Sequence, residues 1–133
     1  MITSLHLPYP PSVNHYWGQF GKQKFIGKKG KEFRMAVSEV CIDMELQTLD
    51  GRLAVHVAIW PPDNRKRDVD NVLKPLLDAM EHAGVYENDS QIDELHIIRH
   101  PPIKGGACSV VLVPISQRMP LSGTAQSPQE HSA

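Results

Sequence analysis

An alternating run at residues 52–60 constrains the fold most strongly. Its sequence, R-L-A-V-H-V-A-I-W, brings an apolar side chain to the same side at every second position. This spacing is typical of a β-strand with one buried face. Pro61 and Pro62 follow directly, and proline cannot donate a hydrogen bond to a sheet, so we expect the strand to end there.

Residues 70–83 predict an amphipathic helix, because apolar side chains recur at three- and four-residue intervals and Gly84 supplies a C-terminal stop. Pro75 is tolerated only in the first turn of a helix, where its missing N–H would be unpaired anyway. We therefore expect the regular helix to begin near Asn71, with Asp70 or Asn71 as its N-cap. Its expected buried side comprises Val69, Leu73, Leu76, Leu77, Met80 and Ala83.

The remaining elements complete a mixed α/β pattern. A second helix is predicted over residues 31–48, with an apolar stripe of Phe33, Ala36, Val37, Val40, Cys41 and Met44. Strands are expected at residues 2–8, 22–27, 52–60, 91–99 and 106–115. The order ββαβαββ predicts a single domain, in which a mixed sheet carries two main helices. Residues 106–115 are almost wholly apolar, so we expect that strand to be central and covered on both faces.

Length and composition fit one small domain. The chain has 133 residues, of which 41% are hydrophobic. Cys41 and Cys108 lack a C-x-x-C spacing, and we expect reduced, packed thiols in a cytoplasmic protein. The sequence contains neither the ~20 consecutive apolar residues of a membrane helix nor a signal-peptide pattern. We expect residues 1–115 to form the folded domain, and residues 116–133, rich in Ser, Pro and Gln, to form a disordered tail.

Basic residues are unevenly distributed, although the formal net charge is −1. Six of the fourteen fall between Lys22 and Arg34, with only Glu32 opposing them. Such a cluster indicates a site for a polyanion, although a solvated loop can have the same composition. Tyr16 and Trp17 precede the cluster, where exposed aromatic rings can stack on unpaired bases. Packing at a strand edge is the more frequent role of such residues.

The most informative charges follow the proline pair Pro61 and Pro62. Three basic residues, Arg65, Lys66 and Arg67, run directly into the carboxylates Asp68 and Asp70. Mg²⁺ prefers oxygen ligands, usually one or two carboxylates together with waters and phosphate oxygens. Carboxylates can hold the ion while the flanking cations hold a phosphate backbone. These are the parts of a metal-dependent nuclease.

Two later residues extend this candidate site. Lys74 lies four residues after Asp70 and can share its helix face, where an ammonium group would stabilise the charge that develops on a phosphate. Asp89 lies beyond Gly84 and can supply a third carboxylate. The structural alternative is a plain ion-pair ladder from Asp70 through Lys74 to Asp78. Zinc is a weaker alternative, because the spacing of its candidate ligands matches no known pattern: His82, His96, His100 and Cys108.

The sequence resembles the RusA family of crossover junction endodeoxyribonucleases. The resemblance covers residues 2–115 and is carried by L-P-Y-P-P-S-V-N-H-Y-W, R-K-R-D-V-D-N-V-L-K-P-L-L-D-A-M, E-N-D-S-Q, and K-G-G before the last strand. It implies a small homodimeric α/β nuclease, often encoded by prophages, that resolves Holliday junctions, which are branched four-way DNA, with Mg²⁺. Matched by position, Asp68, Asp70 and Asp89 are the metal-binding carboxylates, and Lys74 is the catalytic lysine. Pro75 is a departure that bears on how Lys74 is aimed.

The resemblance also implies how DNA is held and cut. Phosphate contacts from the basic segments would give salt-dependent affinity with little sequence information. The expected DNA-binding residues are Lys22, Lys24, Lys28, Lys29, Lys31, Arg65, Lys66, Arg67 and Lys104. A two-fold dimer would make two symmetric nicks that leave 5′-phosphate and 3′-hydroxyl ends. Two alternatives stay open, namely a metal-dependent nuclease of different structure specificity and a non-catalytic DNA-binding module.

Overall fold

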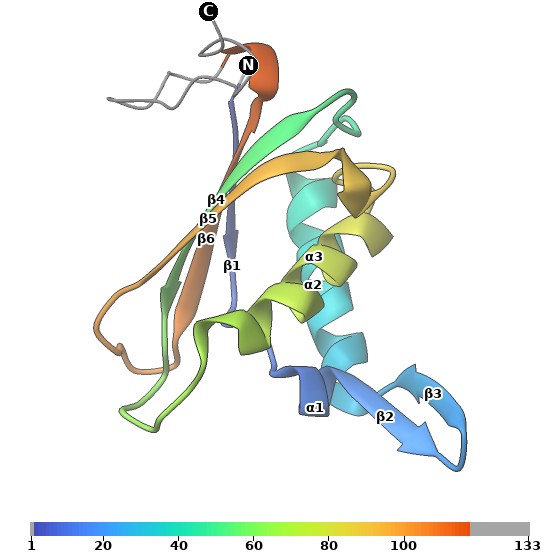
Figure 1. Ribbon diagram of the computed structural model, residues 1–133, viewed down its shortest axis with the longest axis vertical. Helices are drawn as coiled ribbons and strands as arrows, with labels where there is room; N and C mark the ends of the chain where they lie inside the picture. Colours follow the sequence, from blue (N-terminus) through green and yellow to red (C-terminus); the bar gives the residue numbers. More distant parts are fainter. Residues whose placement is uncertain (1, 118–133) are drawn as a thin grey trace, which may run out of the picture.

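The computed structural model describes residues 2–117, and its centre is a four-stranded mixed sheet with the order β1-β6-β4-β5 (Figure 1). The strands are β1 (Thr3–Leu7), β4 (Leu53–Trp60), β5 (Ile92–Arg99) and β6 (Ala107–Pro114). β6 runs antiparallel to both β1 and β4, whereas β4 and β5 are parallel. The predicted mixed α/β class is confirmed, and four of the five predicted strands form this sheet.

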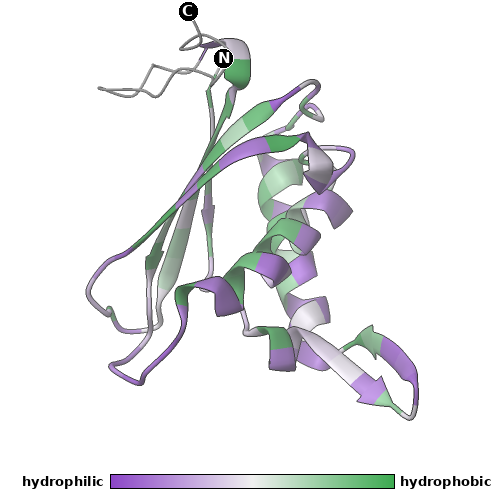
Figure 2. Ribbon diagram, viewed as in Figure 1, coloured by the Kyte–Doolittle hydropathy of each residue, from purple (hydrophilic) through white to green (hydrophobic). Residues whose placement is uncertain are grey.

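Two long helices, α2 (Lys28–Asp43) and α3 (Leu73–His82), lie on one face of the sheet (Figure 1). α3 connects the parallel strands β4 and β5, as a crossover helix must. The sheet and the helices meet in one apolar core. Hydrophobic and hydrophilic residues alternate along both helices, as expected for elements with one buried face (Figure 2). Its fully buried members include Leu5, Val37, Val55, Leu76, Met80, Val110 and Leu112.

The apolar strand β6 is central, as predicted, but it is covered on only one face in the single chain. Val110 and Leu112 are fully buried, whereas Val111 and Val113 are half-buried. Both long helices pack on the side of Val110, so the prediction that both faces are covered is wrong.

The segment before α2 contains elements that sequence reasoning did not separate. A single turn of helix, α1 (Val13–Tyr16), leads into an antiparallel hairpin of β2 (Trp17–Phe20) and β3 (Gln23–Ile26). The hairpin extends away from the central sheet (Figure 1). Tyr16 is fully buried, so its expected packing role is confirmed. Gly30 allows this packing, because a Cβ there would lie 2.2 Å from the Tyr16 carbonyl oxygen.

α2 begins three residues earlier and ends five residues earlier than predicted. Gly27 is its N-cap, so the lysines that precede residue 31 belong to the helix and occupy its first turn. At the other end, Glu45 adopts a left-handed backbone conformation (φ 52°). Met44 is 45% exposed, so including it in the apolar stripe was wrong. The helical spacing of apolar residues therefore continues in the sequence beyond Asp43, where the helix ends.

α3 begins at Leu73, two residues later than predicted. A 3₁₀ turn, η1 (Val69–Val72), precedes it, with Asp68 as the N-cap of that turn. The N-cap of α3 itself is Val72, so the expected cap at Asp70 or Asn71 was wrong. Pro75 is the third residue of α3 and therefore lies in the first turn, where its missing N–H costs no hydrogen bond. Pro75 thus correctly indicated that the helix begins only a few residues before it, but it gave no sign of the extra 3₁₀ turn.

Two other expectations concern the whole chain. Cys41 and Cys108 are both buried and unbonded, as predicted. No helix among residues 2–117 is long and apolar enough to cross a membrane. Residues 118–133, most of the expected disordered tail, lie outside the described residues.

Candidate active site

Asp68 and Asp70 lie together where the basic loop after β4 enters η1. Asp68 has an extended backbone (φ −82°, ψ 139°), and Asp70 is the second residue of the 3₁₀ turn. Both are exposed. In a regular α-helix, residues two apart point to different faces, but Asp68 precedes the helical backbone, so this limit does not apply. Two exposed carboxylates on one short turn are suited to an ion that keeps water and phosphate oxygens as its other ligands.

Lys74 lies in the first turn of α3 and is exposed. The ion-pair ladder that sequence offered as an alternative does not form. Asp78 instead accepts hydrogen bonds from Arg34 (2.8 Å) and from the hydroxyl of Tyr16 (2.5 Å). Among the described residues, Lys74 has no ion pair within 4.0 Å. Its ammonium group is therefore available to a substrate.

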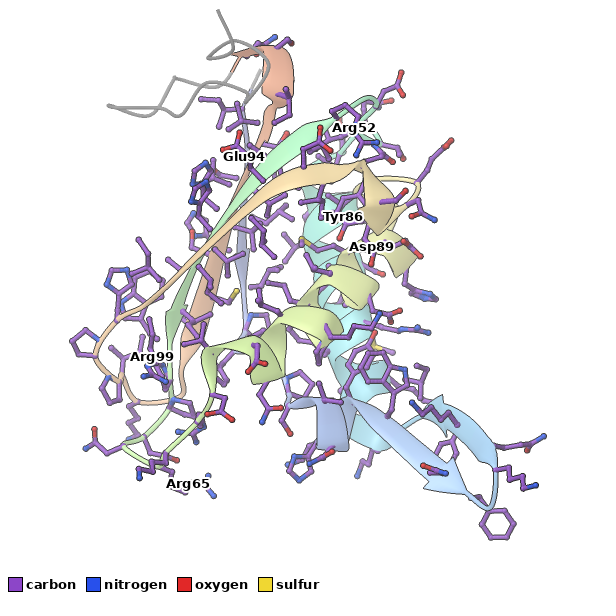
Figure 3. The ribbon with its side chains drawn as sticks, viewed as in Figure 1. Arg52, Arg65, Tyr86, Asp89, Glu94 and Arg99 are labelled. Carbon is purple, nitrogen blue, oxygen red and sulfur yellow. The ribbon has the colours of Figure 1, made fainter. Side chains whose placement is uncertain are left out.

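Asp89 lies at the opposite end of α3. It begins the 3₁₀ turn η2 (Asp89–Gln91), and its backbone N–H donates to Oε1 of Glu81 (2.8 Å), in the last turn of α3. Asp70 precedes the first turn of the same helix. The ten residues of α3 at 1.5 Å per residue separate the two ends by about 15 Å. Figure 3 likewise shows Asp89 far along the molecule from the basic loop that carries Arg65.

Within one chain, the three aspartates therefore do not converge. Among residues 2–117, no three His, Cys, Asp or Glu side chains are grouped so that they could hold one metal ion. The same holds for the zinc candidates His82, His96, His100 and Cys108. Asp68 and Asp70 stand two residues apart at one end of α3, and Asp89 lies at the other end.

The basic loop is held in place by Asp63, a residue that sequence reasoning missed. Its carboxylate pairs with Arg67 (2.7 Å) and Arg65 (3.1 Å), and these hydrogen bonds, chiefly that from Arg67, lower the pKa of Asp63 well below its usual value. Nη1 of Arg99, at the end of β5, donates to the Arg67 carbonyl oxygen (2.5 Å) (Figure 3). The available sequence signal was the D-x-R spacing, which is typical of an aspartate that caps its own turn.

The predicted DNA-binding cations form two groups, one around the basic loop and one around the hairpin, and their side chains differ in exposure. The side chain of Arg67 is only 20% exposed, so it fixes the loop as much as it offers charge, whereas Arg65 is 79% exposed. Lys66 and Lys104 are also exposed at this end of the molecule. The second group is exposed on the hairpin and in the first turn of α2: Lys22, Lys24, Lys28, Lys29 and Lys31.

A groove of about 700 Å³ separates these cationic groups. Lys29 lines it from α2, and residues 65–67 line it from the opposite side, together with Asn71 of η1. Gly105, next to Lys104, also reaches it. The sequence predicted basic residues at both places but gave no indication that they face one hollow beside Asp70.

A polar cluster fixes α3 relative to the hairpin. Tyr16 precedes β2, Arg34 lies on α2 and Asp78 lies on α3, and each contacts the other two. Burial alone would raise the pKa of Asp78, but the hydrogen bonds from Tyr16 and Arg34 outweigh it and lower that pKa. The cluster ties the cationic hairpin to the helix that carries Lys74.

Comparison with known proteins supplies the class of the chain. A family model described as endodeoxyribonuclease RusA matches residues 8–110. Two similar proteins are the crossover junction endodeoxyribonucleases of Enterobacteria phage HK97 and of Shigella sonnei strain Ss046. The phage protein is 41% identical over 105 residues, which cover 78% of this chain and 88% of that protein. The Shigella protein is 32% identical over 113 residues, which cover 82% and 92%.

A third relative, the crossover junction endodeoxyribonuclease of Enterobacteria phage 82, is 32% identical over 110 residues. The chain is thus an endodeoxyribonuclease, a hydrolase of phosphodiester bonds. It belongs to the RusA family, as the resemblance implied, and such a nuclease uses divalent metal.

Proposed function

We propose that this chain resolves four-way DNA junctions by Mg²⁺-dependent, paired and symmetric nicks that leave 5′-phosphate and 3′-hydroxyl ends. The observation that carries the proposal is the exposed pair Asp68 and Asp70 at the end of a fixed cationic loop, in a chain of this family. The junction as substrate is inferred from the relatives, which are named crossover junction endodeoxyribonucleases.

The residues present suit Mg²⁺. Asp68 and Asp70 provide two exposed carboxylates on one turn, and Mg²⁺ commonly takes one or two carboxylates and fills its other positions with water and phosphate oxygens. When bound there, the ion would polarise the scissile phosphate and lower the pKa of a water molecule.

The protein's own cations have two roles in this proposal. Lys74, which is exposed and unpaired among the described residues, would donate to the phosphate oxygens as negative charge accumulates in the transition state. Arg65, Lys66 and Lys104 would hold the phosphates on either side of the cut, and the hairpin lysines would hold a junction arm. These contacts position the strand without reading its sequence.

The position of Asp89 supports a homodimer with a shared site. Asp89 lies about one helix length from Asp70, so it cannot reach the same ion in its own chain. A two-fold axis near the middle of α3 would bring Asp89 of the partner subunit to Asp70, and would do the same at the second site. Each of the two sites would then use Asp68 and Asp70 from one subunit and Asp89 from the other.

The edge strand β5 offers a surface for this pairing. Among the described residues β5 pairs only with β4, and Leu95 is 39% and Ile98 is 60% exposed. β5 begins directly after η2 and ends at Arg99, which holds the basic loop. Two copies paired antiparallel through this edge would place the Asp89 end of one beside the Asp68 end of the other.

A synthetic four-way junction tests the proposal against a linear duplex of the same sequence, with Mg²⁺ or with EDTA. We expect paired nicks at symmetric positions in the junction only, only with Mg²⁺, and products that ligase can seal. Cleavage of the duplex at a similar rate would favour a nuclease of different specificity. Binding without any cut would favour the non-catalytic module.

A further inference from the structure

The groove beside the aspartate turn has more space than phosphate binding needs. Its walls come from the loop after β1, α2, the basic loop and η1. Its volume of about 700 Å³ lies within the roughly 300–1,000 Å³ typical of pockets that enclose a small organic group. A phosphodiester backbone alone would lie across the cationic rim and leave this hollow empty.

The groove has an apolar floor within a cationic rim. The apolar lining includes Pro10, Phe33, Ala36, Pro62 and Val72. The rim cations are Lys29, Arg65, Lys66 and Arg67. A nucleotide has the complementary character, because its base has apolar faces and its phosphates are anionic. A peptide or a lipid headgroup would not need cations on both sides of an apolar floor.

Tyr9 provides one wall of the groove. The Arg67 guanidinium lies 6.0 Å from the centre of the Tyr9 ring, and Asp63 holds that guanidinium in place. Gly106 packs against the base of this side chain, where a Cβ would lie 2.8 Å from Tyr9 Cβ. Tyr9 and the guanidinium over its ring are therefore positioned together before any ligand arrives, and such a planar aromatic and cationic pair is suited to stack with a base.

Glu32 is the one acidic residue in the lining of the groove. It lies on the face of α2 that also presents Lys29, Phe33 and Ala36, at helical spacing. A carboxylate repels phosphates, so the substrate group that faces Glu32 must be a hydrogen-bond donor. Cytosine, adenine and guanine each carry an exocyclic amino group that can donate to it, and thymine does not.

From these contacts we propose that the groove holds one unstacked nucleotide of the junction strand next to the scissile phosphate, and that Glu32 selects a base with an exocyclic amino group. Asn71 lines the groove and directly follows Asp70, so the phosphate of a nucleotide held there would face the carboxylates. The groove would thus set which base stands beside the cut. This inference rests on the proposed function.

Glu32→Gln tests the selection by Glu32. The variant keeps the size of the side chain but replaces the carboxylate by an amide, which can face any base edge. On junctions that differ only in the nucleotides flanking the cut, we expect its preference for cytosine, adenine or guanine over thymine to fall at least about fivefold in relative kcat/KM. Glu39→Gln is the matched control, since Glu39 is an exposed glutamate of the same helix outside the groove.

A second measurement does not depend on cutting. Junctions would carry the fluorescent base 2-aminopurine at single positions around the cut, and binding would be followed in EDTA. We expect the fluorescence to change at the nucleotide next to the cut, where the base leaves its stack, while positions further along the arms stay as in the free junction.

Two results would overturn the inference. One is an unchanged base preference in Glu32→Gln; the other is a 2-aminopurine signal that does not change at the cut position on binding. If the wild type cuts junctions normally in these experiments, only the groove proposal fails. If the wild type cuts no junction at all, the proposed function fails instead.

Discussion

At the scale of single residues, Asp70 carries the most direct prediction. Asp70→Asn removes the charge of one metal ligand but leaves the exposed loop and its cations unchanged. We expect junction cleavage to fall by at least a factor of about 100, with junction affinity largely retained. Gel-shift titration and single-turnover cleavage would separate the two quantities. Weaker binding with unchanged cleavage of the bound complex would contradict the role of Asp70 as a metal ligand.

The hydrogen-bonded carboxylate of Asp78 should make the stability of the folded chain depend on pH. Its pKa is lowered in the folded chain, so its contribution is complete above the unfolded value of about 3.9 and is lost as the pH falls through the folded pKa. Asp78→Asn should lower the free energy of unfolding near pH 7 by about 1.5–3 kcal/mol, the usual range for hydrogen bonds to a charged group.

Urea denaturation of both proteins between pH 7 and pH 2 would measure this contribution. The difference between wild type and Asp78→Asn should shrink below about pH 4, because the wild type then loses the same charge. Asp43→Asn, an exposed aspartate on α2, is the control and should change stability little. A difference that stays constant with pH would show that the charge of Asp78 is not what stabilises the cluster.

The closeness of the carboxylate pair to its cationic flank could be predicted from sequence, but the distant residues that share their groove could not. The carboxylate pair and its cationic flank stand in one continuous stretch, so their proximity follows from the covalent chain. Tyr9 and Glu32 reach the same groove from segments more than thirty residues away from that stretch. Nothing local in the sequence indicates such a meeting, because it depends on how α2 and the loop after β1 pack on the sheet.

At the scale of elements, the strongly periodic segments were predictable and their ends were not. β4 was predicted to within one residue, because alternation and two prolines define it. The helix α2 ended early because Glu45 adopts a left-handed conformation that glycine would normally mark. The start of α3 was displaced by a 3₁₀ turn, which has no clear composition signal.

The β2–β3 hairpin gives a prediction at the same scale. Lys22 and Lys24 are exposed on it, and each is expected to contact a phosphate. The double change Lys22→Gln and Lys24→Gln should reduce the slope of log K against log salt by about two and weaken binding to all sequences equally. Filter binding between about 50 and 300 mM salt, a roughly sixfold range, would measure this slope.

Arg52→Gln is the comparison for that experiment, because Arg52 pairs with Asp93 at the start of β5, away from both cationic groups. It should leave the salt slope unchanged. An equal loss of slope in both variants would indicate a general effect of net charge and would remove the hairpin from the DNA-binding surface.

At the scale of the whole molecule, the described chain places two of its carboxylates at one end of α3 and the third at the other. A helix of this length is rigid, so no side-chain rotation brings Asp89 to Asp70. The predicted set of three carboxylates is therefore not assembled within one described chain, and the metal-binding role of these residues stays a prediction. A sequence shows which carboxylates are present, but not which subunit supplies them to a site.

Mixing two inactive variants tests the shared site. Asp70→Asn and Asp89→Asn should each be inactive as homodimers, because every site lacks one carboxylate. In a mixed dimer, one site combines both substitutions, while the other receives Asp68 and Asp70 from one chain and Asp89 from the other, and is intact. After the variants are mixed and their subunits exchange, about half of the dimers should each carry one working site.

Such a mixture should nick one strand of a junction and fail to make the paired cut, which denaturing and native gels distinguish. Each variant incubated alone is the control. Mixing Asp68→Asn with Asp70→Asn is the matched negative, because both substitutions fall on the same subunit's share of each site and no intact site can form. If the Asp70→Asn and Asp89→Asn mixture is equally inactive although size and mass measurements show mixed dimers, the carboxylates belong to a single chain and Asp89 acts elsewhere.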